Sequence, residues 1–130
     1  MKGPGQKPDV LVVDDDAILR DLVGDWLEAA GYAVRKAFDC DSALQALGER
    51  LPALIICDMF MAGPCGAVAI GELKRRAPGA HLIAVSGYFN SGQRMTADEA
   101  LAAGAARALA KPVRRAQLLV AVSELIGPPN

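Results

Sequence analysis

The 130-residue sequence predicts an α/β domain with a parallel sheet and helices on both faces. Short apolar runs alternate about five times with longer segments whose apolar residues recur every three or four positions, as in successive βα units. Some runs have no polar alternation, for example Leu54–Cys57, which is typical of a strand buried on both faces. Each crossover between parallel strands should be right-handed.

Ten elements follow from this pattern in alternating order. The predicted strands are residues 10–13, 32–37, 53–58, 81–86 and 107–110. The predicted helices are residues 17–30, from 39 or 41 to about 50, 66–77, 97–103 and 114–126. We expect one domain over residues 9–127, preceded by a flexible Gly/Pro/Lys tail at 1–8 and followed by a short tail at 128–130.

Capping residues support the helix boundaries. Asp16 can cap the first helix and either Asp39 or Asp41 the second, because a side-chain oxygen there accepts from unpaired backbone N–H groups. Thr96 and Glu99 have the spacing of a capping box at the fourth helix. The first helix contains a regular apolar series, namely Ile18, Leu19, Leu22, Val23, Trp26, Leu27 and Ala30.

Composition excludes several classes of protein. With 52% hydrophobic and 22% charged residues, the chain is globular rather than disordered. Its net charge of -1 gives no electrostatic reason to expect direct nucleic-acid binding. Each apolar run is too short to cross a membrane, and the N-terminus lacks the apolar core of a signal peptide. Three cysteines without close pairing favour the reducing cytoplasm.

Polar side chains follow four of the five predicted strands. Asp14, Asp15 and Asp16 come after the first strand, and Asp58 ends the third. Ser86 ends the fourth strand, and Lys111-Pro112 follows the fifth. Because the carboxyl ends of parallel strands meet at one edge of a sheet, we expect these groups to lie together.

Such a cluster suits phosphoryl chemistry. Neighbouring carboxylates repel one another unless a hard cation such as Mg²⁺ compensates, and Asp14, Asp15 and Asp58 offer the oxygen ligands that it prefers. Ser86 and Lys111 add donors for an anion with three equatorial oxygens. Asp58 is then placed to act as a nucleophile and form an acyl phosphate.

This combination, over residues 10–126, resembles the receiver domain of two-component response regulators. The resemblance implies a flavodoxin-like (βα)5 fold with strand order 2-1-3-4-5. It implies that Asp58 is the phosphoacceptor, that Ser86 and Lys111 contact the phosphoryl group, and that the bond to Pro112 is often cis. The implied Mg²⁺ ligands are Asp15 directly, Asp14 mostly through water, Asp58 itself and the backbone carbonyl of Phe60.

The resemblance also implies partners and a location. A histidine kinase or histidine phosphotransfer protein would donate the phosphoryl group, and an unknown downstream protein would respond to it. The domain would assist its own phosphorylation and dephosphorylation without being an enzyme. We expect a cytoplasmic domain that contacts neither nucleic acid nor membrane, and homodimer formation is left open.

The sequence departs from the family at several places. Ala62 stands where proline is common, and Ala108 stands where the family usually has Tyr or Phe. That aromatic residue normally reports phosphorylation, and Tyr88 or Phe89, in a loop that is longer than usual, could replace it. Phe60 and Tyr88 flank the expected phosphate, so we predict slow hydrolysis.

Two other functions are compatible with parts of the sequence. A phosphorylation-independent interaction module of the same fold is favoured by Ala108 and opposed by the complete set of site residues. An aspartyl-nucleophile phosphatase would need a second Asp two residues after the nucleophile, and that position is Phe60. Phosphoacceptor signalling is therefore the preferred interpretation.

Overall fold

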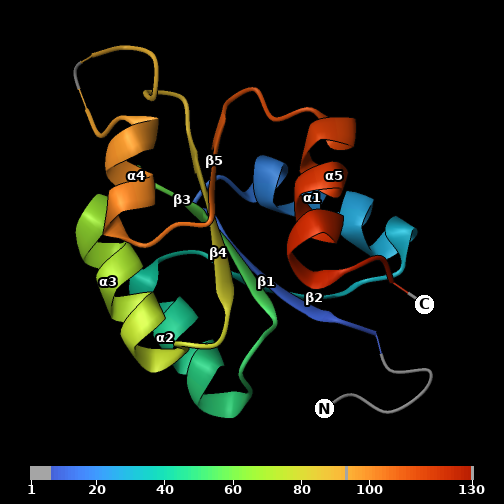
Figure 1. Ribbon diagram of the computed structural model, residues 1–130. Helices are drawn as coiled ribbons and strands as arrows, with labels where there is room; N and C mark the ends of the chain where they lie inside the picture. Colours follow the sequence, from blue (N-terminus) through green and yellow to red (C-terminus); the bar gives the residue numbers. More distant parts are fainter. Residues whose placement is uncertain (1–6, 93, 130) are drawn as a thin grey trace.

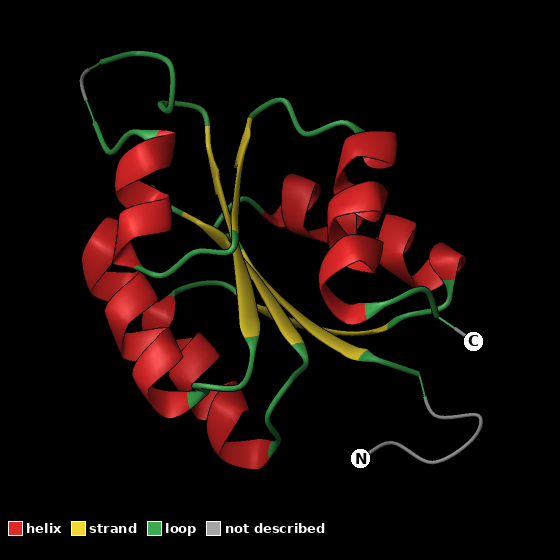
Figure 2. Ribbon diagram, in the orientation of Figure 1, coloured by secondary structure: helices red, strands yellow, loops and turns green. Residues whose placement is uncertain are grey.

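The computed structural model describes residues 7–92 and 94–129. Its strands are β1 (Asp9–Val13), β2 (Ala33–Ala37), β3 (Leu54–Asp58), β4 (His81–Ser86) and β5 (Arg107–Ala110). Its helices are α1 (Ala17–Ala30), α2 (Cys40–Glu49), α3 (Gly66–Arg76), α4 (Ala97–Ala103) and α5 (Arg115–Ile126). Strands and helices alternate along the chain as predicted (Figure 2). Most of the predicted N-terminal tail and the last residue of the predicted C-terminal tail lie outside the described residues.

All strand pairs are parallel, and the sheet order is β2-β1-β3-β4-β5. Helices α1 and α5 cover one face of the sheet, and α2, α3 and α4 cover the other (Figure 1). The predicted flavodoxin-like fold and strand order are therefore confirmed. The edge position predicted for the second strand is confirmed as well, since β2 pairs with β1 alone.

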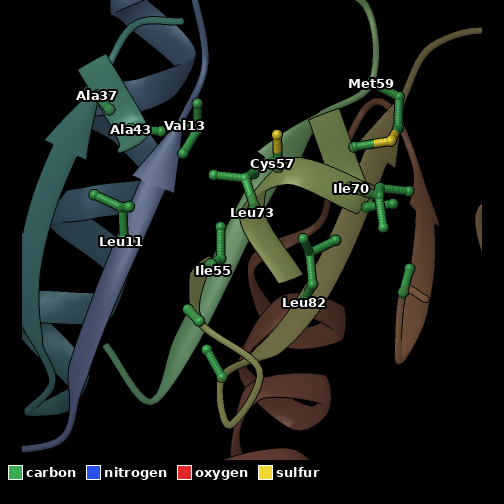
Figure 3. Close-up of a cluster of buried hydrophobic side chains, with 14 of the residues drawn as sticks. Leu11, Val13, Ala37, Ala43, Ile55, Cys57, Met59, Ile70, Leu73 and Leu82 are labelled. Carbon is green, nitrogen blue, oxygen red and sulfur yellow. The ribbon is translucent and has the colours of Figure 1, made fainter. Parts of the chain in front are cut away.

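Two apolar layers hold the helices against the sheet. Successive residues of a strand point to opposite faces, so Leu11 and Ile55 pack toward α2 and α3, whereas Val10 and Ile56 pack toward α1 and α5. Figure 3 shows the first layer, in which Leu73 of α3 lies among side chains from the strands. Both faces of the central strands are apolar for this reason, which explains the uninterrupted runs in the sequence.

The predicted helix caps are present, and the alternatives for α2 are resolved. Asp16 Oδ1 accepts hydrogen bonds from the backbone N–H groups of Ile18 (3.0 Å) and Leu19 (3.2 Å). Asp39, rather than Asp41, caps α2 in a capping box with Ser42. These bonds satisfy donors that a helix N-terminus otherwise leaves unpaired.

The assignment of Ile18 to the apolar face of the first helix is wrong, because its side chain is 79% exposed. Val68, near the start of α3, is 63% exposed in the same way. Both residues belong to the first turn of a helix and lie on its solvent side, whereas Ala69, in the same turn of α3, is fully buried. Within the described ranges, no helix has the length and apolar character needed to cross a membrane.

Candidate functional site

The predicted site residues meet at the carboxyl edge of the sheet. Strand β3 lies between β1 and β4, and the register pairs Asp58 with Val85, which directly precedes Ser86. Asp14 follows β1 directly, and its backbone N–H donates to the carbonyl of Ala37 (3.1 Å). The topology therefore brings residues that are up to 97 positions apart in sequence to one place.

Lys111 connects the acidic groups. Its Nζ lies 3.2 Å from Oδ2 of Asp58 and 3.5 Å from Oδ2 of Asp14. The backbone N–H of Lys111 donates to the carbonyl of Ser86 (3.0 Å), and the Lys111–Pro112 peptide bond is cis. The lysine is thus tied to the end of β4 by its backbone, while its side chain reaches the carboxylates.

Asp14, Asp15 and Asp58 form a cluster in which one oxygen from each lies within 4.8 Å of the others. Asp14 and Asp58 are buried, with 8% and 5% exposure, whereas Asp15 is exposed. Oxygen donors in this arrangement fit a hard divalent cation, and the exposed side of the cluster leaves room for water ligands. The residues present therefore suit a divalent-metal site.

Burial governs the electrostatics of this cluster. Burial raises the pKa of Asp58, against the opposing effects of the Phe60 backbone N–H and of Lys111, and Asp14 raises it further. For Lys111, burial alone would lower the pKa, but the carboxylates of Asp58 and Asp14 outweigh burial and raise it. The ionised carboxylates and the ammonium group therefore stabilise one another, and the excess negative charge favours a bound cation.

Backbone groups of the following loops orient two of the side chains. The N–H of Phe60 donates to Oδ1 of Asp58 (3.2 Å), and the N–H of Tyr88 donates to Oγ of Ser86 (2.9 Å). Ser86 is 3% exposed. Because its oxygen accepts this bond, the hydroxyl hydrogen can point toward an anion bound at Asp58.

Sequence reasoning missed two arginines near the site. Arg20 of α1 donates from Nη1 to the backbone carbonyl of Asp14 (2.9 Å) and so braces the acidic loop. Arg94, in the loop before α4, stacks on two aromatic rings near Asp58. Neither contact can be predicted from the sequence. The Arg20 contact uses a backbone carbonyl, which every residue has, and the Arg94 contact depends on how the loops after β3 and β4 lie relative to each other.

Ala108 packs against the apolar layer between the sheet and α2, α3 and α4, a layer that also contains a buried aromatic residue. Phe89 is 6% exposed and belongs to the apolar cluster against which Ala108 packs. Tyr88 instead lies at the surface of the site, with its ring 5.1 Å from that of Phe60. The two aromatic residues of this loop are therefore directed to different places.

Comparison with known families and curated proteins agrees with this geometry. The family model described as the response regulator receiver domain matches residues 10–123. The nitrogen assimilation regulatory protein NtrX of Azorhizobium caulinodans is 34% identical over 86% of this chain and 24% of its own length. An uncharacterized 14.6 kDa protein of Leptolyngbya boryana is 35% identical over 94% of both chains. The chain spans about a quarter of the length of several curated relatives.

Solved structures show the same likeness. The receiver domain of NtrX from Brucella abortus superposes with a TM-score of 0.83 at 34% identity, covering 91% of this chain and 98% of that one. A response regulator from Burkholderia pseudomallei, solved with a phosphorylated aspartic acid, calcium ion and citrate, has a TM-score of 0.78 at 29% identity, covering 92% and 66%. Fold, matched family model and relatives coincide, and the chain therefore belongs to the response regulator receiver domain family, the phosphoacceptor domains of two-component signalling.

Proposed function

We propose that Asp58 accepts a phosphoryl group from a histidine kinase or histidine phosphotransfer protein, in a Mg²⁺-dependent reaction. The observation that carries this proposal is the position of the Asp58 carboxylate, which lies 3.2 Å from the Lys111 ammonium group and within 4.8 Å of an oxygen from each of Asp14 and Asp15. One carboxylate oxygen could then attack phosphorus while Lys111 and a divalent cation offset the charge that develops. The receiver domain would occupy residues 9–127.

The transfer would form one bond to phosphorus and break another. An Asp58 oxygen forms a bond to phosphorus, and the bond from phosphorus to the donor imidazole nitrogen breaks. That nitrogen keeps the bonding electron pair and takes a proton from water, and an acyl phosphate remains on Asp58. Lys111 and the hydroxyl of Ser86 would bind the transferred oxygens, which places the phosphorus in line with the attacking oxygen.

A Mg²⁺ ion, when bound, would neutralise charge on the transferring oxygens. We assign it to Asp14, Asp15, Asp58 and the backbone carbonyl of Phe60, a set of hard oxygen ligands. These ligands lie at the end of β3 and in the loops after β1 and β3, so the segments that would bind the ion also orient Asp58. The domain would thereby assist its own phosphorylation and its own hydrolysis, without acting on another substrate.

The phosphorylated state would be passed on by protein–protein contact with a downstream protein. Among family members generally, receivers contact kinases and effectors. We propose no direct contact of this chain with nucleic acid or membrane, and self-association into a homodimer stays open. A cytoplasmic location remains a prediction from the cysteine content.

Intact-protein mass spectrometry after incubation with Mg²⁺ and acetyl phosphate tests the proposal. We expect one added phosphoryl group on the native chain, none on Asp58→Asn, and an unchanged addition on Asp41→Asn, whose carboxylate belongs to α2 and not to the cluster of Asp14, Asp15 and Asp58. If the native chain takes up no phosphoryl group and also fails to bind Mg²⁺ in a titration, the phosphoacceptor proposal is wrong.

One observation favours a second function. Ala108 cannot act as the aromatic reporter of the family, so a receiver-like module that binds its partner regardless of phosphorylation would tolerate this residue. The negative result just described would support that module. The phosphatase alternative gains nothing from the structure, because the side chain of Phe60 packs against Tyr88 and has no acid or base to offer.

A further inference from the structure

Three residues form a small cluster at the mouth of the site: Phe60, Tyr88 and Arg94. The rings of Phe60 and Tyr88 meet edge to face, with centroids 5.1 Å apart and an interplanar angle of 61°. The guanidinium carbon of Arg94 lies 4.1 Å from the Phe60 centroid and 5.0 Å from the Tyr88 centroid. Both distances are within the range of an attractive cation–π contact. The two rings therefore hold the Arg94 guanidinium group in a defined position.

This cluster is attached directly to the phosphoryl-binding residues. Phe60 and Tyr88 use their backbone N–H groups to bind Asp58 and Ser86, respectively. Arg94, Phe60 and Ser86 also line one cavity of about 260 Å³, whose remaining walls are two methionines and a cysteine. Arg94 is thus the cationic residue of a cavity that opens beside Ser86.

The contacts with the rings leave the guanidinium donors available to bind an anion. The two cation–π contacts use the charge of the guanidinium and pair none of its five N–H donors with a hydrogen-bond acceptor. Among the residues that the structure describes, no carboxylate forms an ion pair with Arg94. Lys111, in contrast, already contacts two carboxylates. Within the described part of the site, Arg94 is therefore a cationic residue that is not paired with a carboxylate.

Charge balance shows where that cation is needed. A phosphoryl group on Asp58 would replace one negative charge with about two. Together with Asp14 and Asp15, the site would then carry about four negative charges, of which Lys111 and one divalent ion offset about three. About one negative charge remains uncompensated, and a further cation beside the phosphoryl oxygens would offset it.

We propose that Arg94 is a phosphoryl-binding residue, which donates from its guanidinium N–H groups to a phosphoryl oxygen of phosphorylated Asp58 while its guanidinium carbon stays over the rings of Phe60 and Tyr88. The inference rests on the proposed function, since it concerns the state in which Asp58 carries the group. It assigns the loop between β4 and α4 a direct contact with that group, in addition to the contacts of Ser86 and Lys111.

Side-chain NMR of the arginine Nε–H groups tests this contact on the whole chain. Beryllofluoride with Mg²⁺ forms a tetrahedral phosphoryl mimic on a carboxylate and serves as the probe. We expect the Arg94 Nε–H resonance to move downfield and to exchange more slowly with water when the mimic binds. The Nε–H of Arg50 should stay unchanged, because it pairs with Asp9 at the other edge of the sheet.

Variants give an independent measurement. Arg94→Gln should weaken the apparent affinity for beryllofluoride about tenfold, as expected for one charge-assisted hydrogen bond, and Arg94→Lys should weaken it less. Affinity for Mg²⁺ alone should not change. Arg75→Gln is the matched control, because it removes the same charge from the exposed end of α3.

The outcomes separate this inference from the function beneath it. If the backbone amides of Asp58 and Ser86 shift with the mimic but the Arg94 Nε–H does not, Arg94 does not bind the phosphoryl group, although the phosphoacceptor function stands. An equal loss of affinity in Arg75→Gln would also overturn the inference, since it would show a general effect of charge. If no site amide shifts at all, the proposed function fails and the role of Arg94 fails with it.

Discussion

At the scale of single residues, Phe60 has the clearest effect on the lifetime of a phosphoryl group. It lies two positions after Asp58, binds Oδ1 of Asp58 through its backbone, and leaves 42% of its surface exposed at the mouth of the site. A bulky ring there should hinder an attacking water. We therefore expect Phe60→Asn to lose its phosphoryl group several-fold faster than the native chain, as followed by intact mass over time.

A second exposed phenylalanine provides the control for that experiment. Phe38 is 59% exposed in the loop before α2 and makes no ring contact with Tyr88 or Arg94 in the described chain. Phe38→Asn should leave the hydrolysis rate unchanged. Equal lifetimes in Phe60→Asn and the native chain would contradict the shielding role of Phe60.

Tyr32 links pH to stability at a place far from the site. It is 2% exposed, and its hydroxyl donates to the carbonyl of Gly127 (2.9 Å), after the last helix. Burial raises the pKa of Tyr32 above its ordinary value near 10. The neutral hydroxyl is therefore the form that the folded state favours. Its contribution to stability is complete below about pH 10 and is lost as pH rises through the raised pKa.

Replacing Tyr32 with Phe should remove the part of the pH dependence of stability that comes from this hydroxyl. Urea unfolding at neutral pH should show a loss of about 1 kcal/mol, the net contribution of one hydrogen bond. Because the variant lacks the titrating hydroxyl, the difference in the free energy of unfolding between the native chain and Tyr32→Phe should become smaller as pH rises above about 10. If this difference in the free energy of unfolding stays constant with pH, the pKa of the Tyr32 hydroxyl does not change on unfolding.

At the scale of elements, the start of α2 offers a test of capping against simple charge. Asp39 is the N-cap and bonds the Ser42 N–H at 2.7 Å, whereas Asp41 lies in the first turn and contributes only its charge. We expect Asp39→Ala to cost about 1 kcal/mol in urea unfolding. Asp41→Ala should cost less, about 0.3–0.5 kcal/mol, because the helix dipole at an exposed position is a weaker effect.

Salt separates the two effects further. The loss in Asp41→Ala should shrink at high ionic strength, since exposed charges are screened, whereas the loss in Asp39→Ala should largely remain. Equal and equally salt-dependent losses would mean that the capping hydrogen bond adds nothing beyond charge.

At the scale of the whole molecule, the question is how a phosphoryl group at the sheet edge changes distant surfaces when position 108 is alanine. Phe89 is buried in the cluster against which Ala108 packs, and it lies in the loop after β4, three residues beyond Ser86. We therefore expect Phe89 to relay the state to α4, which packs in the same layer, and from there across β5 to α5 on the other face. Phe89→Ala should abolish the phosphorylation-dependent NMR shifts of α5, whereas Tyr88→Ala should preserve them.

A volume-conserving variant distinguishes relay from loss of packing. Phe89→Leu keeps an apolar side chain in the core and should retain part of the shifts, while Phe89→Ala also leaves a cavity that lowers stability. Shifts of α5 that persist in both Phe89→Ala and Tyr88→Ala would show that neither residue replaces the missing aromatic.

The sequence by itself determined the element order and the buried central strands, and it predicted a group of polar residues that the structure brings together at one edge of the sheet. Local periodicity and capping residues depend on neighbours in the chain, so they can be seen without coordinates. The site could be predicted for a topological reason. Parallel strands bring their carboxyl ends to one edge, and the strand order makes β1, β3, β4 and β5 consecutive, so Asp14, Asp58, Ser86 and Lys111 lie at neighbouring strand ends.

Only the tertiary structure decided contacts between segments that are distant in sequence. Asp9, buried at the start of β1, pairs with Arg35 of β2 at 2.9 Å and with Arg50 after α2 at 3.2 Å. Arg94 reaches Phe60 in the same way, across two loops. The sequence cannot show such pairs, because their free energy depends on the separation and burial of side chains, which exist only once the sheet and its helices have packed.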